Sequence, residues 1–78
     1  MNYKELSFII QEQTEIVADI LSAELADIGF ESFINNEEGL VAYINASLYD
    51  EEKIYQVIEN LPIKTNISFS SIEIESKN

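Results

Sequence analysis

Hydrophobic and polar residues alternate near the start of the chain. Leu6, Phe8 and Ile10 are each separated by a single residue. A period of two is typical of a strand with one buried face. The pattern predicts a strand over residues 3–11.

The hydrophobic spacing then lengthens to that of a helix. The residues that fall on one side at this spacing are Val17, Leu21, Leu25 and Ile28. Thr14 is a candidate N-cap, and Gly29 is a candidate C-terminal stop. We therefore predict a helix from Thr14 to about Ile28.

Two short hydrophobic runs, 30–34 and 40–44, flank the sequence Asn36-Glu37-Glu38-Gly39. Asn in the first position and Gly in the last are typical of a type I turn. We expect Gly39 to form a bulge that closes a three-residue hairpin loop. This register predicts two opposite faces, one with Phe30, Ile34, Leu40, Ala42 and Ile44 and the other with Phe33, Val41 and Tyr43.

A second helix is predicted between Asp50 and Pro62. Asp50 suits an N-cap, and Pro62 is incompatible with continuation. The amphipathic pattern is i, i+3, i+4, i+7, at Ile54, Val57, Ile58 and Leu61.

Residues 66–75 predict a last strand with a change of phase. Ile67 and Phe69 share one phase of the alternation, and Ile72 and Ile74 share the other. A bulge near residues 70–71 would bring all four to the same face.

The predicted order is β-α-β-β-α-β, the ferredoxin-like arrangement of the α+β class. It gives a four-stranded antiparallel sheet with two helices on one face and the other face open. Leu6, Phe8, Ile54 and Val57 should be buried beneath the helices. Residues 1–78 form a single domain by length. The polar end Glu75-Ser76-Lys77-Asn78 stops the chain just where the last strand finishes, so we expect the chain to be a piece of a longer protein.

The charge of the chain is strongly negative. Fifteen Asp and Glu stand against four Lys and no Arg, a formal net charge of −11. Such a surface repels nucleic acid and anionic lipid and attracts a basic partner. No secretion signal and no apolar stretch of membrane-spanning length is visible, so a cytoplasmic location is expected.

The residue types needed for most catalytic sites are missing. The chain has no His, Cys or Arg and only two Gly. We therefore expect no catalytic, cofactor-binding or metal-binding residue. The acidic runs 37–38 and 50–52 lack the spacing of a calcium loop and suit a hairpin tip and a helix N-terminus. Glu24 lies within the apolar sector of its helix, where we expect it at the solvent-exposed rim.

The candidate contact residues are Ile9, Phe33, Val41 and Tyr43, together with Ile72, on the predicted open face of the sheet. An exposed apolar group of this size marks a contact site. Tyr43 combines an apolar ring with a polar tip. A partner protein, a neighbouring domain or a second copy of the chain would each use such a surface.

Three segments resemble the N-terminal domain of bacterial ribosomal protein L11 methyltransferases, especially those of Bacteroidetes. They are DILSAELADIGFESF (19–33), EGLVAYI (38–44) and SLYDEE (47–52). The resemblance covers nearly the whole chain, in matching order. Its motifs are patterns of fold residues and not catalytic signatures.

The resemblance implies a ferredoxin-like domain that recognises a basic large-subunit ribosomal protein. It also implies a catalytic domain, joined by a linker, that binds S-adenosylmethionine and methylates amino groups. No catalytic or cofactor residue of that second domain can be placed on this chain. The alternative is a regulatory domain of the same βαββαβ type that senses a small molecule.

Overall fold

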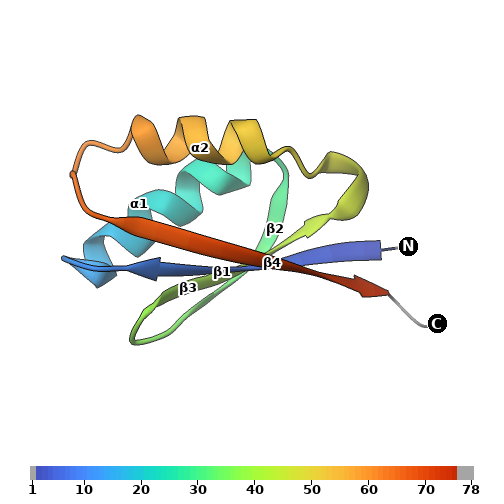
Figure 1. Ribbon diagram of the computed structural model, residues 1–78, viewed down its shortest axis with the longest axis horizontal. Helices are drawn as coiled ribbons and strands as arrows, with labels where there is room; N and C mark the ends of the chain where they lie inside the picture. Colours follow the sequence, from blue (N-terminus) through green and yellow to red (C-terminus); the bar gives the residue numbers. More distant parts are fainter. Residues whose placement is uncertain (1, 76–78) are drawn as a thin grey trace.

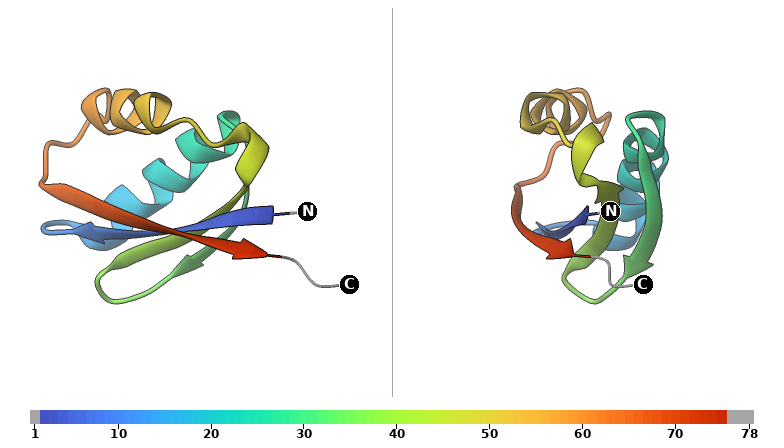
Figure 2. Two further views of the ribbon diagram at one scale, coloured as in Figure 1. Left: turned by 45° about the vertical axis from the view of Figure 1, so that its right-hand side comes forward. Right: turned by 90° about the vertical axis from the view of Figure 1, so that its right-hand side faces the viewer.

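The computed structural model describes residues 2–75. Its elements are β1 (Asn2–Ile10), α1 (Thr14–Asp27), β2 (Phe30–Asn35), β3 (Gly39–Asn45), the short 3₁₀ helix η1 (Ala46–Leu48), α2 (Glu51–Glu59) and β4 (Ile67–Glu75). The strands form one antiparallel sheet in the order β2-β3-β1-β4. Both helices lie on the same side of this sheet (Figures 1 and 2). The predicted α+β, ferredoxin-like fold is confirmed.

The core lies between the sheet and the two helices. Leu6 and Phe8 of β1 are buried, as is Ile54 of α2, and all three predictions are confirmed. Val57 is only partly buried and packs at the edge of the core. The buried residues are Leu6, Phe8, Ile10, Val17, Ala18, Leu21, Leu25, Phe30, Leu40, Ala42, Ile44, Ile54 and Leu61.

Helix α1 begins at Thr14, and the residue before it takes the capping position. Gln13 has left-handed backbone angles, φ 53° and ψ 45°, and its side chain makes no capping hydrogen bond. The prediction of Thr14 as the N-cap is therefore wrong by one residue. The Thr14 hydroxyl instead donates to the Ile10 carbonyl oxygen at 3.1 Å, which ties the helix to the end of β1. Gly29, with φ 110°, follows the helix as predicted.

Helix α2 is capped as the sequence predicts. The Asp50 carboxylate accepts a hydrogen bond from the backbone N–H of Glu52 at 3.0 Å. This bond satisfies a backbone donor that has no partner within the helix. The helix ends at Glu59, before Pro62.

The β2–β3 hairpin has a shorter loop than the sequence analysis assumed. The backbone N–H of Asn36 donates to the Gly39 carbonyl at 3.0 Å, and the N–H of Gly39 donates back at 3.3 Å. Only Glu37 and Glu38 remain in the loop. The Asn36 side chain also accepts from the backbone N–H groups of Glu38 and Gly39. The turn is confirmed, but the three-residue closure and its bulge at Gly39 are wrong.

The shorter loop moves the register of β2 by one residue. Ile34 pairs with Val41, and Phe33 pairs with Ala42. Because neighbouring residues of a strand face opposite ways, a shift of one residue exchanges their faces. Phe33 therefore packs against the core, and Ile34 is exposed on the opposite face. A bulge between Phe30 and Ser32 restores the predicted burial of Phe30.

Strand β4 is regular along its whole length. Its pairing with β1 runs from Ile10↔Ile67 to Asn2↔Glu75 without a shift. The predicted bulge near residues 70–71 is therefore wrong. Ile67 and Phe69 face the helices and pack against the core, whereas Ile72 and Ile74 face the other way.

Candidate interaction face

The side of the sheet away from both helices carries an exposed apolar surface. Alternation along the strands places these side chains opposite the buried ones. Ile34 and Ile72 are the most exposed, at 56% and 57%. We call this surface the open face; its residues are Tyr3, Glu5, Ile9, Ile34, Val41, Tyr43, Ile72 and Ile74.

Four of the five candidate contact residues, Ile9, Val41, Tyr43 and Ile72, lie on the open face. Ile9 is exposed, and Val41 and Tyr43 are half-buried. Phe33 lies on the helix side and leaves the candidate set, because of the register of β2. The structure brings in Ile34, which the sequence analysis assigned to the core.

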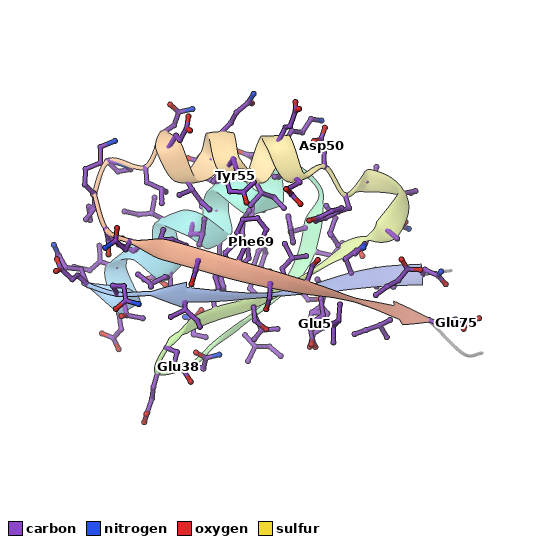
Figure 3. The ribbon with its side chains drawn as sticks, viewed as in Figure 1. Glu5, Glu38, Asp50, Tyr55, Phe69 and Glu75 are labelled. Carbon is purple, nitrogen blue, oxygen red and sulfur yellow. The ribbon has the colours of Figure 1, made fainter. Side chains whose placement is uncertain are left out.

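The centre of the open face holds a carboxylate paired with a tyrosine. Glu5 of β1 lies directly opposite Tyr43 of β3. The Tyr43 hydroxyl donates to Glu5 Oε1 at 2.7 Å. This hydrogen bond is the main reason why the pKa of Tyr43 is raised above its usual value, with desolvation adding to it. Figure 3 shows Glu5 projecting on the side opposite the helices.

A second carboxylate lies beside Tyr3, at the β2 border of the open face. Glu31, at the bulge of β2, raises the pKa of Tyr3, chiefly through a side-chain hydrogen bond. None of the lysines in residues 2–75 balances these two charges on the open face. Lys4 approaches Glu73 at 3.8 Å on the helix side, Lys53 belongs to α2, and Lys64 donates to the carbonyl of Glu59. The open face is therefore apolar with a negative charge.

Removing the Glu5 carboxylate should make Tyr43 easier to ionise. In Glu5→Gln, we expect the pKa of Tyr43 to fall, because the carboxylate no longer opposes formation of the phenolate. In the parent, the hydrogen bond contributes its full stabilisation of the fold at pH values below the pKa that Tyr43 has in the unfolded chain. That stabilisation is lost as the pH rises through the higher pKa that Tyr43 has in the folded protein. Nuclear magnetic resonance of tyrosine-labelled protein would follow each ring during a pH titration. Glu31→Gln is the matched control. It should lower the pKa of Tyr3 and leave the pKa of Tyr43 unchanged.

A hollow of about 510 Å³ lies between the start of α1 and the β2–β3 hairpin. Glu15 and Glu37 are among its lining residues. Its lining has no His, Cys, Lys or Arg that could pair with them in acid–base or nucleophilic chemistry. Within residues 2–75, no three His, Cys, Asp or Glu side chains gather in a way that could hold a metal ion. No helix in the same range is long and apolar enough to cross a membrane.

The three other acidic features singled out in the sequence lie at the protein surface. Glu24 is exposed on α1, as expected for a residue at the helix rim. Asp50 caps α2, and Glu37 and Glu38 form the exposed tip of the hairpin.

The fold and its open face define a small ferredoxin-like α+β domain with an apolar, acidic sheet surface. Comparison with curated proteins relates the chain to one group of proteins. It is 45% identical over 78 residues to the ribosomal protein L11 methyltransferase of Bacteroides fragilis, and the match covers 99% of the chain. The proteins of the same name from Phocaeicola vulgatus and Bacteroides thetaiotaomicron are 40% and 42% identical.

These matches confirm the resemblance to the N-terminal domain of Bacteroidetes ribosomal protein L11 methyltransferases. The chain spans 28% of the length of these relatives. No protein-family model matches the chain. No solved structure matches it either.

Proposed function

We propose that this chain is the substrate-recognition domain of a ribosomal protein L11 methyltransferase. The observation that carries the proposal is the match of almost the whole chain to 28% of the length of proteins with that name. In this proposal the rest of the protein supplies the catalytic domain. The domain described here binds the ribosomal protein and places its amino groups near that catalytic domain. It thereby contributes proximity and orientation to methyl transfer.

The open face provides a suitable binding surface for a basic ribosomal protein. Ile9, Val41 and Tyr43 offer apolar contact, and an exposed apolar surface commonly marks a protein contact. Glu5 and Glu31 would attract cationic side chains at the same surface. The formal net charge of −11 would steer the encounter from a distance. A basic protein is therefore a better partner than a nucleic acid or an anionic membrane.

S-adenosylmethionine fits the missing part of the protein better than this chain. A cofactor cradle commonly needs glycines where a ligand approaches the backbone. A Cβ at Gly39 would overlap the carbonyl oxygen of Phe8, and one at Gly29 would lie 3.3 Å from the Leu48 side chain. Both glycines thus accommodate the protein's own atoms. We assign the methyl donor to the catalytic domain, and the protein to the cytoplasm, where ribosomal proteins are made.

Binding of ribosomal protein L11 to the purified chain tests the proposal directly. Surface plasmon resonance at low and high salt would give both rate constants. We expect saturable binding in which added salt slows association more than it speeds dissociation, because charge steering acts on the encounter. A second ribosomal protein of similar positive charge is the control for specificity.

Equal binding of both ribosomal proteins would show that charge alone drives association and would contradict the proposal. Absence of L11 binding would contradict it as well. Calorimetry with S-adenosylmethionine should show no saturable heat. Saturable binding of this cofactor would overturn the assignment of the methyl donor to another domain.

A further inference from the structure

The two edges of the sheet differ in how well they are protected. At one edge, β2 has six residues and a bulge next to Phe30. At the other, β4 has nine residues in uninterrupted register with β1. Figure 2 shows these strands on opposite sides of the sheet. Bulges, prolines and lysines protect edge strands from pairing with another chain, and β4 has none of them.

The hydrogen-bond pattern shows which backbone groups of β4 point outward. Beyond the end of β1, the N–H of Gln11 donates to the Asn66 carbonyl at 3.0 Å. In an antiparallel pair, such bonded positions recur at every second residue. Ser70 and Ile72 therefore bond to β1. The backbone N–H and C=O groups of Ser71 and Glu73 point away from the sheet.

The opposite edge of β1 supports this assignment. Ile10 donates to the Glu38 carbonyl at 2.8 Å, on the side of β3. The backbone groups of even-numbered residues of β1 thus form hydrogen bonds with β3, and those of odd-numbered residues form hydrogen bonds with β4. Along residues 67–75, the structure shows no backbone hydrogen bond from Ser71 or Glu73 to a loop or helix. Residues 70–75 are all exposed, so no described element covers this edge.

The side chains of β4 define the chemistry that a neighbouring strand would meet. On one side, Ile72 and Ile74 are exposed and extend the open face to the edge. On the other side, Glu73 accepts a hydrogen bond from the Asn2 side chain at 2.8 Å and lies 3.8 Å from Lys4. Both contacts are to residues of β1, so they hold the Glu73 carboxylate in place on the helix side of the sheet. A strand added here would meet isoleucines on one side and the exposed acidic residues Glu73 and Glu75 on the other, with Lys4 balancing part of the charge of Glu73.

We propose that the outer edge of β4 binds an extended, basic segment of the partner protein as a fifth strand. In such a segment, apolar and cationic side chains would alternate along the strand. The apolar side chains would lie beside Ile72 and Ile74, and the cationic side chains would lie beside Glu73. Backbone hydrogen bonds to Ser71 and Glu73 would supply affinity, as in other cases of strand addition. The identity of the partner as ribosomal protein L11 rests on the proposed function; the edge and the chemistry of its segment do not.

A basic segment fits this edge better than a second copy of the chain. Two copies would bring together formal net charges of −11 each. An antiparallel β4–β4 pair would also bring together two strands that each carry Glu73 and Glu75. Analytical ultracentrifugation should therefore show a monomer, and a salt-independent dimer that Ser71→Pro dissolves would overturn the choice of occupant.

The first test removes one outward-pointing donor. Ser71→Pro deletes an N–H that β1 does not use, and proline is tolerated on an edge strand at such a position. We expect affinity for ribosomal protein L11 to fall by about tenfold, because the variant loses one backbone hydrogen bond to the added strand and the local geometry of β4 changes. Ser71→Ala keeps the N–H and should bind within about twofold of the parent. Unchanged binding by Ser71→Pro would overturn the proposal while leaving the proposed function intact.

The second test needs no variant and no ribosomal protein. The probe is a capped peptide of alternating Lys and Val, with a peptide of the same composition in two blocks as its control. Amide hydrogen exchange of the parent should slow at Ser71 and Glu73 with the alternating peptide and stay unchanged with the blocked one. If the alternating peptide slows exchange but ribosomal protein L11 does not bind, the proposed function is contradicted and the strand-addition proposal stands. Unchanged exchange at both residues would overturn the strand-addition proposal.

Discussion

Replacing Leu6 by alanine is expected to lower the free energy of unfolding by about 2–5 kcal/mol. Leu6 lies at the middle of β1 with no exposed surface. It pairs with Ala42 on one side and Ser71 on the other, so both neighbours in the sheet are small. Small neighbours cannot fill the cavity that the substitution leaves, which favours a large loss. In a 78-residue domain, that loss is a large part of the total stability.

Urea denaturation followed by circular dichroism measures this effect. Ile9→Ala is the control, because Ile9 is on the same strand but is 42% exposed on the open face. Ile9→Ala should cost less than about 1 kcal/mol. Similar losses in the two variants would show that β1 does not have one buried and one open face.

Replacing Tyr43 by alanine is expected to weaken binding of ribosomal protein L11 by more than about 1 kcal/mol, or at least fivefold. Tyr43 is central on the open face and half-buried, with its hydroxyl on Glu5. The substitution removes an aromatic contact and releases the carboxylate that it orients. Because Tyr43 is not part of the core, the fold should be retained. Calorimetric titration would give the affinity, and circular dichroism would check the fold.

Tyr55→Ala provides a matched aromatic control. Tyr55 is 51% exposed on α2 and packs against Phe69, on the helix side of the sheet. Its loss should leave L11 binding unchanged. Val41→Asp should weaken binding as Tyr43→Ala does, because it places a charge within the apolar surface. If Tyr55→Ala reduces affinity and these two variants do not, the recognition surface is on the helix side.

The sequence was sufficient to predict the order of the elements and most of the core. The alternation around Leu6 and the helical spacing around Ile54 each fit one secondary structure with one buried face. The Asp50 cap was also predictable, because its side chain acts within its own helix turn. Such local signals do not depend on how distant strands align.

Register was the part that local signals could not predict. The motif Asn36-Glu37-Glu38-Gly39 is compatible with two or three residues in the loop, and one residue decides which face Phe33 occupies. The bulge at the start of β2 then compensates for this choice at Phe30 but not at Ile34. A phenylalanine and an isoleucine are equally suited to burial, so composition could not distinguish them.

The phase change in β4 had a different origin. The alternation changes phase between Phe69 and Ile72, and a bulge at residues 70–71 would bring Ile72 and Ile74 to the same face as Ile67 and Phe69. Hydrophobic residues are also common on protein surfaces, and an exposed group of them indicates a contact. The strand kept its register, and the two isoleucines became part of the open face.

The pairing of β1 with β4 has a consequence for how the chain folds as it is synthesised. Asn2 pairs with Glu75, so the first strand of the described residues completes its hydrogen bonds with the last of them. Until β4 leaves the ribosome, β1 can pair only with β3, and the odd-numbered backbone groups of β1 form an unpaired edge. Contacts this distant in sequence slow folding and leave apolar strands open to association with other chains. Truncation before Ile67 should therefore yield an aggregation-prone chain, because β1 would keep that unpaired edge permanently.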